Sequence, residues 1–161
     1  MTLAGITDAW ITDLLTNVAA LSTVTTKTTH RYASWSPEQL QAFTNERHLA
    51  VWPNGDVETA AGFLAGSPPS DISTQSFTIV VWEEAASEAT GLYDDDTANA
   101  AWLALYEAIR ERLYVSASTS GPAALGGSDV VTRFVAGNMG MRGAVRYMEL
   151  AFHVRLALTY T

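Results

Sequence analysis

The chain has 161 residues, of which 48% are hydrophobic and 16% charged, and its formal net charge is −8. This composition is typical of one globular domain and excludes a disordered chain. The nine basic residues are scattered, which argues against general nucleic-acid binding, because phosphate contacts need clustered Lys and Arg. Cysteine is absent, so disulfides, thiolate metal sites and cysteine nucleophiles are excluded. No secretory signal or apolar run of about 20 residues is present, so we expect a soluble protein.

The first 45 residues predict two helices. Apolar residues at helical spacing over Ile6–Leu21 predict an amphipathic helix, with Thr7 as a candidate N-cap. Asp8 and Asp13 suit the positive N-terminal half of that helix. A capping signal made of Ser, Pro and Gln predicts a short second helix over Pro37–Asn45.

The next part of the chain predicts strands. The apolar run His48–Trp52 predicts one strand, and the following Pro53–Asp56 predicts a turn into a second strand over Val57–Phe63. Residues 65–71 are rich in Gly, Ser and Pro and predict a flexible loop. Ser76–Glu84 is apolar on both faces, which predicts a strand in the centre of its sheet.

The second half of the chain predicts a long helix and two strands. The helix covers Thr97–Leu113, and a loop of small residues over 116–128 resembles a flexible arm. Strands are expected over Asp129–Ala136 and Ala144–Tyr160, with the glycine-rich Gly137–Gly143 as their turn. The apolar stripe expected on the helix consists of Ala98, Ala101, Trp102, Leu105, Ile109 and Leu113.

The final strand has the sharpest pattern in the sequence. Strict alternation predicts one face on the core, with Met148, Leu150, Phe152, Val154, Leu156, Leu158 and Tyr160, and one polar face. At about 3.3 Å per residue the strand would run roughly 50 Å, so we expect a bend, a bulge or a partner chain. Together the elements predict one α+β domain over residues 1–161, mainly an antiparallel sheet with two main helices packed on one face.

No residue set predicts catalysis, a cofactor or a metal. The spacings of His30, His48 and His153 fit no usual ligand pattern. Glu83 and Glu84 are adjacent on a strand and point to opposite faces, so they cannot serve one substrate together. The triplet Asp94–Asp96 lacks the ligand spacing of a calcium loop. Solvated charge is the preferred interpretation of both acidic groups, and we expect the protein not to be an enzyme.

Tryptophan is frequent, and two of the five predict a contact surface. Trp10 and Trp102 lie on the helical core stripes, where packing explains them. Trp35 stands in a polar loop, and Trp82 lies on the second face of its strand. Because exposed tryptophan is enriched at protein interfaces, Trp35 and Trp82 are candidate interface residues, with packing inside the chain as the alternative.

Five elements in their order carry a resemblance to a known family. They are the helix Ile6–Leu21, the strands His48–Trp52 and Phe77–Glu83, the helix Thr97–Leu113 and the closing strand Tyr147–Tyr160. This order resembles the tail terminator (tail completion) proteins of long-tailed bacteriophages. The similarity spans most of the chain, but it is one of pattern and includes no diagnostic motif.

The resemblance implies a structural virion protein of the tail or neck, assembled in the host cytoplasm. Such a protein forms a homo-hexameric ring that caps the tail tube, ends its polymerisation and joins it to the head–tail connector protein. DNA would be a passing cargo of the channel, and no membrane would be involved. A ring contact is head-to-tail, so it joins two different patches of each subunit. We expect the Gly137–Gly143 turn and the final strand to make that contact; the candidate residues there are Met139, Met141, Arg142, His153 and Arg155.

Other functions remain open on the sequence. A head-closure protein or a tail tube subunit would have similar size and α+β content, although a tube subunit would polymerise into long tubes by itself. A small-molecule-binding or enzymatic domain would need polar groups that converge on an apolar cavity. A toxin or immunity-type binder would use the acidity against a basic partner.

Overall fold

A computed structural model describes residues 3–22, 28–31, 47–64, 70–84, 96–119, 131–142 and 145–159. The elements are α1 (Leu3–Asn17), α2 (Ala19–Ser22), β1 (Thr28–Arg31), β2 (Arg47–Leu64), β3 (Ser70–Glu84), α4 (Asp96–Thr119), β4 (Val131–Arg142) and β5 (Val145–Thr159). The five strands form one sheet in the order β1-β2-β3-β5-β4. Every neighbouring pair is antiparallel except β1 with β2. The expected α+β fold with a mainly antiparallel sheet is confirmed.

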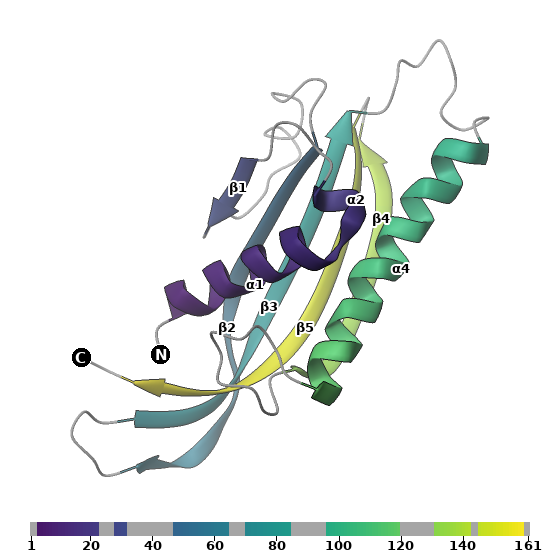
Figure 1. The fold of residues 1–161 in the computed structure, drawn as a ribbon. Coiled ribbons are helices and arrows are strands. Elements are labelled where there is room, and N and C mark those ends of the chain that lie inside the picture. The colour runs from purple at the N-terminus through teal and green to yellow at the C-terminus, as the bar shows by residue number, and fades with distance from the viewer. Residues whose placement is uncertain are drawn as a thin grey trace.

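Both main helices pack on the same face of this sheet (Figure 1). From α1 the predicted stripe of Ile6, Trp10, Leu14, Val18 and Leu21 is buried, and α4 contributes Trp102, Leu105, Ile109 and Leu113. Ala101 is exposed, so it does not belong to the stripe as expected. The sheet supplies alternate residues of β2, β3 and β5, as the two-residue period of a strand requires. Among them the predicted core-facing Met148, Leu150, Phe152 and Val154 are fully buried.

The N-terminal helix differs in detail from the prediction. It begins at Leu3, so Thr7 is not the N-cap; its hydroxyl lies inside the helix and donates to the Leu3 carbonyl at 2.9 Å. The helix is interrupted at Val18, after which α2 adds one short turn that keeps Leu21 in the core. The sequence did not predict β1, which is short and pairs with the start of β2.

Two predicted turns are strand instead. Pro53–Asp56 lies within β2, where the register between Pro53 and Gly55 slips by one residue. Gly55 has a φ of +111°, a conformation that glycine adopts without strain, so these residues form a bulge in a continuing strand. Asn54 donates from Nδ2 to the Thr78 hydroxyl at 2.6 Å across that bulge. The expected second strand over Val57–Phe63 is therefore the far half of β2, and its partner is β3.

Gly137–Arg142 likewise belongs to β4 and not to a turn. Gly137 and Gly140 allow a neighbouring tyrosine to pack closely against the strand. A Cβ on Gly137 would lie 1.8 Å from the Tyr106 hydroxyl oxygen of α4, and one on Gly140 would lie 2.8 Å from that of Tyr147. Glycine in a strand often marks such a close approach, which sequence alone does not distinguish from a turn.

Strand β5 is continuous and pairs with β3 over its whole length, from Val145 opposite Glu84 to Thr159 opposite Ser70. The described part of β4 pairs with β5 as far as Val154, and beyond that point, among the described strands, β2, β3 and β5 continue. Figure 1 shows these three strand ends curving together away from the helices. We call this extension, residues 56–64, 70–75 and 155–159, the arm.

The expected flexible loops fall only partly on described residues. Residues 70–71 open β3 and residues 116–119 close α4, so the strand and the helix are longer than predicted. Residues 65–69 and 120–128, the short helix Pro37–Asn45 and residues Asp94 and Asp95 lie outside the described residues.

Candidate functional site

The residues predicted for an interface separate into two groups in the structure. Met139, Met141 and Arg142 lie on β4, at the edge of the sheet. Met139 is exposed and Met141 half-buried. Trp82, His153 and Arg155 belong to the face of the sheet opposite the helices, by their register with Tyr147, Ser76 and Thr74. Trp35 lies outside the described residues.

Trp82 belongs to a second apolar cluster on the face that α1 and α4 leave uncovered. The cluster comprises Ala50, Val80, Trp82, Val145 and Tyr147, with Trp52 packed against it. The ring of Trp82 stacks on the imidazole of His48, with the centroids 5.2 Å apart and the planes at 16°. Only 4% of Trp82 is exposed, so its side chain has little area to offer a partner. Of the other two residues there, His153 is half-buried and Arg155 exposed.

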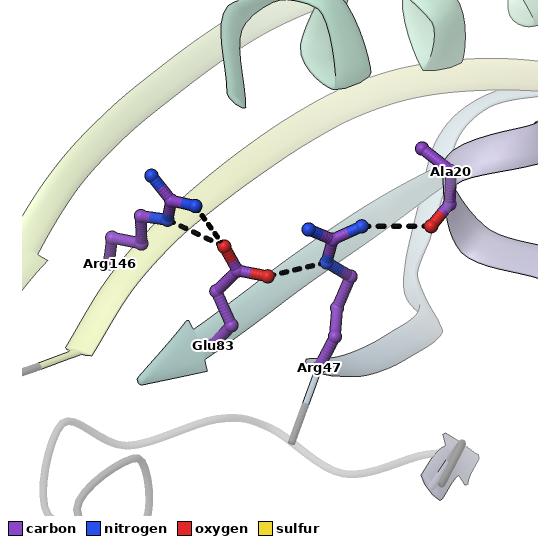
Figure 2. A network of polar contacts seen from close by, with 4 residues as sticks. All are labelled: Ala20, Arg47, Glu83 and Arg146. Atoms are coloured by element: carbon purple, nitrogen blue, oxygen red, sulfur yellow. Dashed lines mark hydrogen bonds and ion pairs between the residues drawn. The ribbon is translucent and has the colours of Figure 1, made fainter. Parts of the chain in front are cut away.

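A charged cluster joins the strands β2, β3 and β5 to α2 (Figure 2). Glu83 of β3 accepts hydrogen bonds from Arg47 of β2, Nε to Oε2 at 2.5 Å, and from Arg146 of β5, Nε to Oε1 at 2.6 Å. Arg146 also reaches Glu83 Oε1 through Nη2. Arg47 donates a further bond from Nη1 to the Ala20 carbonyl of α2 at 2.8 Å. The prediction that Glu83 is a solvated charge is therefore wrong.

Helix α4 completes this cluster through Trp102. The guanidinium of Arg146 lies 4.6 Å from the centroid of the indole ring, and that of Arg47 lies 6.0 Å from it. A cation held over the face of an aromatic ring is attracted by the electrons of the ring, so both contacts favour this arrangement. Two guanidinium groups share one carboxylate, so the three side chains carry a net charge of +1. The arrangement links the ends of three strands to α2 and α4.

A second ion pair joins α1 to α4. Arg112 donates from Nε to Asp13 Oδ2 at 2.8 Å and from Nη2 to Asp13 Oδ1 at 2.6 Å. Asn17 donates to the same Oδ1 at 3.0 Å. The hydrogen bond to Asp13 raises the pKa of Arg112, which keeps the guanidinium charged. Asp13 thus serves tertiary packing, not the helix dipole as expected.

Helix α4 packs along the edge strand β4 through side chains on one stripe. Tyr106 lies over Gly137, and the Arg110 guanidinium lies 4.9 Å from the ring centroid of Phe134. The same guanidinium is 5.8 Å from the ring of Tyr114, which is exposed. A hydrogen bond with Tyr114 raises the pKa of Arg110, so the group remains cationic. The four-residue spacing of Tyr106, Arg110 and Tyr114 is visible in the sequence, but this stripe was not predicted from it.

Within the described ranges, no three His, Cys, Asp or Glu side chains come close enough together to hold a metal ion. In the same part of the chain, no helix combines the length and the apolar character needed to cross a membrane. No family model matches the sequence, and a search of curated proteins finds no match.

Proposed function

We propose that the chain is a structural virion protein of a long-tailed bacteriophage, a terminator that caps the tail tube as a ring. In this role it ends tube polymerisation and joins the tail to the head–tail connector protein. The proposal begins from the order of elements, which resembles that family. Its partners are other copies of the chain, the tail tube protein and the connector, and DNA is only a passing cargo.

The arm is the observation that carries this proposal. Strand β5 has 15 residues, about 50 Å of extended chain, and β3 matches it residue for residue without a register shift. A domain of this size needs much less strand to bury its core, and the arm extends past the last residue with which β4 pairs. Ordered strands that extend beyond the core supply backbone edges and area for contact with another protein.

The acidic charge supports the same role. A formal charge of −8 repels nucleic acid, so a ring of these subunits would let DNA pass without binding it. The ion pairs that join α1 to α4, and β3 to β2 and β5, favour a rigid subunit, which suits a protein that presents fixed surfaces to its partners.

The first test is the assembly state of the purified protein, by mass photometry and negative-stain microscopy. We expect closed rings of one size, or monomers that close into rings on tube ends. Long filaments formed by the protein alone would favour a tail tube subunit and contradict the terminator role.

The second test is tube capping. Adding the protein to polymerising tail tube protein from the same phage should shorten the tubes and leave ring-shaped density at their ends. A variant that lacks residues 59–73 and joins β2 to β3 by a short turn shortens the arm. We expect this variant to fold, which circular dichroism will show. We also expect it to lose most of its effect on tube length. Tubes of unchanged length with the wild-type protein would refute the proposal.

A further inference from the structure

All large hydrophobic side chains that are strongly exposed in the described part of the chain belong to α4 and β4. On α4 they are Leu103 and Tyr114, exposed by 50% and 52%, and on β4 they are Val135 and Met139, exposed by 43% and 39%. Scattered exposed apolar residues need no explanation, but a group on two adjacent elements indicates a contact surface.

The packing of the two elements places Leu103 and Tyr114 beside β4, the strand that carries Val135 and Met139. Tyr106 meets Gly137 and Arg110 meets Phe134, so α4 and β4 run antiparallel to each other (Figure 1). Leu103 lies one turn before Tyr106 and therefore toward Met139, while Tyr114 lies one turn beyond Arg110. We call Leu103, Arg110, Tyr114, Val135 and Met139 the α4–β4 surface. Tyrosine, methionine and arginine are enriched at protein interfaces.

The backbone of β4 adds an open edge to this surface. Within the described strands β4 pairs only with β5, so its outer N–H and C=O groups face away from the sheet. The register slips at Thr132 and at Val135, but from Ala136 to Arg142 it is regular. Bulges, prolines and charges usually protect an edge strand from pairing with another chain. The regular segment has none of these up to Arg142.

We propose that the β4 edge over Ala136–Met141, with the α4–β4 surface beside it, is where a second copy of this chain docks and extends the sheet. Charge favours a second copy as the occupant. Phe134–Met141 contains no charged residue, so it is a stretch where two chains of charge −8 approach with little repulsion. Arg133 and Arg142 flank it in the sequence and Arg110 lies on the surface, so an acidic neighbour is attracted to it.

This inference rests on the proposed function for one point, the closure of the ring. A ring contact is head-to-tail, so the β4 edge of one copy meets a different surface of the next copy. A two-fold contact of β4 with β4 would stop at a dimer instead.

The experiment places one negative charge on or beside the open edge, where it repels an acidic second copy. Met139→Glu and Val135→Glu change exposed side chains, so both should fold with an unchanged thermal melting curve. In sedimentation velocity, each should need at least about tenfold more protein than the wild type for half-assembly. Thr12→Glu is the matched control, because Thr12 is exposed on α1 and the same charge is added away from the edge. Assembly of both edge variants at the wild-type concentration would overturn the proposal.

A single thiol gives a second readout, because the chain has no cysteine of its own. Asn138 is exposed on β4, so Asn138→Cys should react quickly with iodoacetamide in the monomer and at least about tenfold more slowly in the assembly. Thr12→Cys should react at the same rate in both. Equal rates at Asn138→Cys in monomer and assembly would overturn the proposal, and oxidation to a disulfide dimer would indicate the two-fold contact.

The two proposals fail in different ways. Edge variants that remain monomeric, from a wild type that forms rings, support the docking edge. Edge variants that still form rings but no longer shorten tubes would overturn the docking edge and leave the terminator role standing, because the surface would then belong to the tube contact. A wild type that assembles through β4 but has no effect on tubes would refute the terminator role alone.

Discussion

Arg112 of α4 forms a bidentate ion pair with Asp13 of α1, across 99 positions of the sequence. Asp13 is 8% exposed, so its carboxylate oxygens have Arg112 and Asn17 as hydrogen-bond partners in place of water. The pair sets how the two helices lie on the sheet, and the first prediction concerns its loss.

Asp13→Asn keeps the shape of the side chain but removes its charge. We expect a loss of about 1–3 kcal/mol in the free energy of unfolding, because Arg112 keeps its charge and loses its partner. The hydrogen bond raises the pKa of Arg112, so its contribution to stability is fully present at every pH below the ordinary pKa of arginine. The loss in stability should therefore be equal at pH 7 and pH 9. Urea denaturation measures it, with the exposed Glu107→Gln on α4 as control. Equal midpoints for the two variants would contradict the prediction.

The cluster around Glu83 predicts an order of effects. Glu83→Gln leaves Arg47 and Arg146 close together without their shared carboxylate, and should cost about 2–4 kcal/mol. Arg47→Met leaves a neutral pair of Glu83 and Arg146 and should cost less. Guanidinium chloride screens charge, so urea is the suitable denaturant. A larger loss for Arg47→Met than for Glu83→Gln would show that the hydrogen bond from Arg47 to the Ala20 carbonyl, and not charge balance, governs this cluster.

The close approach of Gly137 and Tyr106 allows a test of how α4 packs on β4. Gly137→Ala brings a methyl group against the Tyr106 ring, which must move, so we expect a loss of about 1–3 kcal/mol. In a Tyr106→Ala background the same change should cost close to nothing, because the obstructing ring is gone. Thermal melting of the four proteins of this cycle gives the coupling. Asn138→Ala, at the neighbouring exposed position, is the control for the general effect of alanine in this strand. An equal loss of stability from Gly137→Ala with and without the Tyr106 side chain would argue against the contact between Gly137 and Tyr106.

Glu149 predicts a dependence of stability on pH. It lies on the second face of the sheet, half-buried, with Val80 and Asn138 as its register neighbours. Burial raises the pKa of Glu149, so in the folded protein it binds its proton more tightly than in the unfolded chain. Stability from this group is therefore complete below its ordinary pKa and is lost as the pH rises through the raised value. Glu149→Gln should match the wild type near pH 4 and melt at a higher temperature at pH 7. A variant that is less stable than wild type at pH 7 would contradict the stated cause.

Periodicity predicted those parts of the fold that packing determines. The stripe of α1, the stripe of α4 from Trp102 to Leu113 and the core-facing residues of β5 from Met148 to Val154 follow directly from which residues must leave water, and they are confirmed. The central place of β3 was visible because both of its faces are apolar. The polarity of a single residue was less informative. Glu83 is charged like any surface residue, but two arginines that are far away in the sequence and lie opposite it on the neighbouring strands β2 and β5 make its burial possible.

Glycine and proline were the main source of error. Pro53, Gly55, Gly137 and Gly140 were interpreted as turn residues, yet all four lie within strands. Each glycine is required by a close neighbour or by a bulge, such as the Tyr106 ring over Gly137. These neighbours become visible only in the folded structure. For the candidate interface, the sequence located Met139 and Met141 correctly on one segment, but it could not show that this segment is a sheet edge.

The sheet order has a consequence for synthesis of the chain. β5 lies between β3 and β4, although it follows both in the sequence. A ribosome therefore releases β1, β2 and β3 as one partial sheet and β4 as a strand with no partner among them. The open edge and the arm both depend on β5, so neither exists in its final form until the last described strand is inserted. Subunits that are still being made cannot join an assembly through these surfaces.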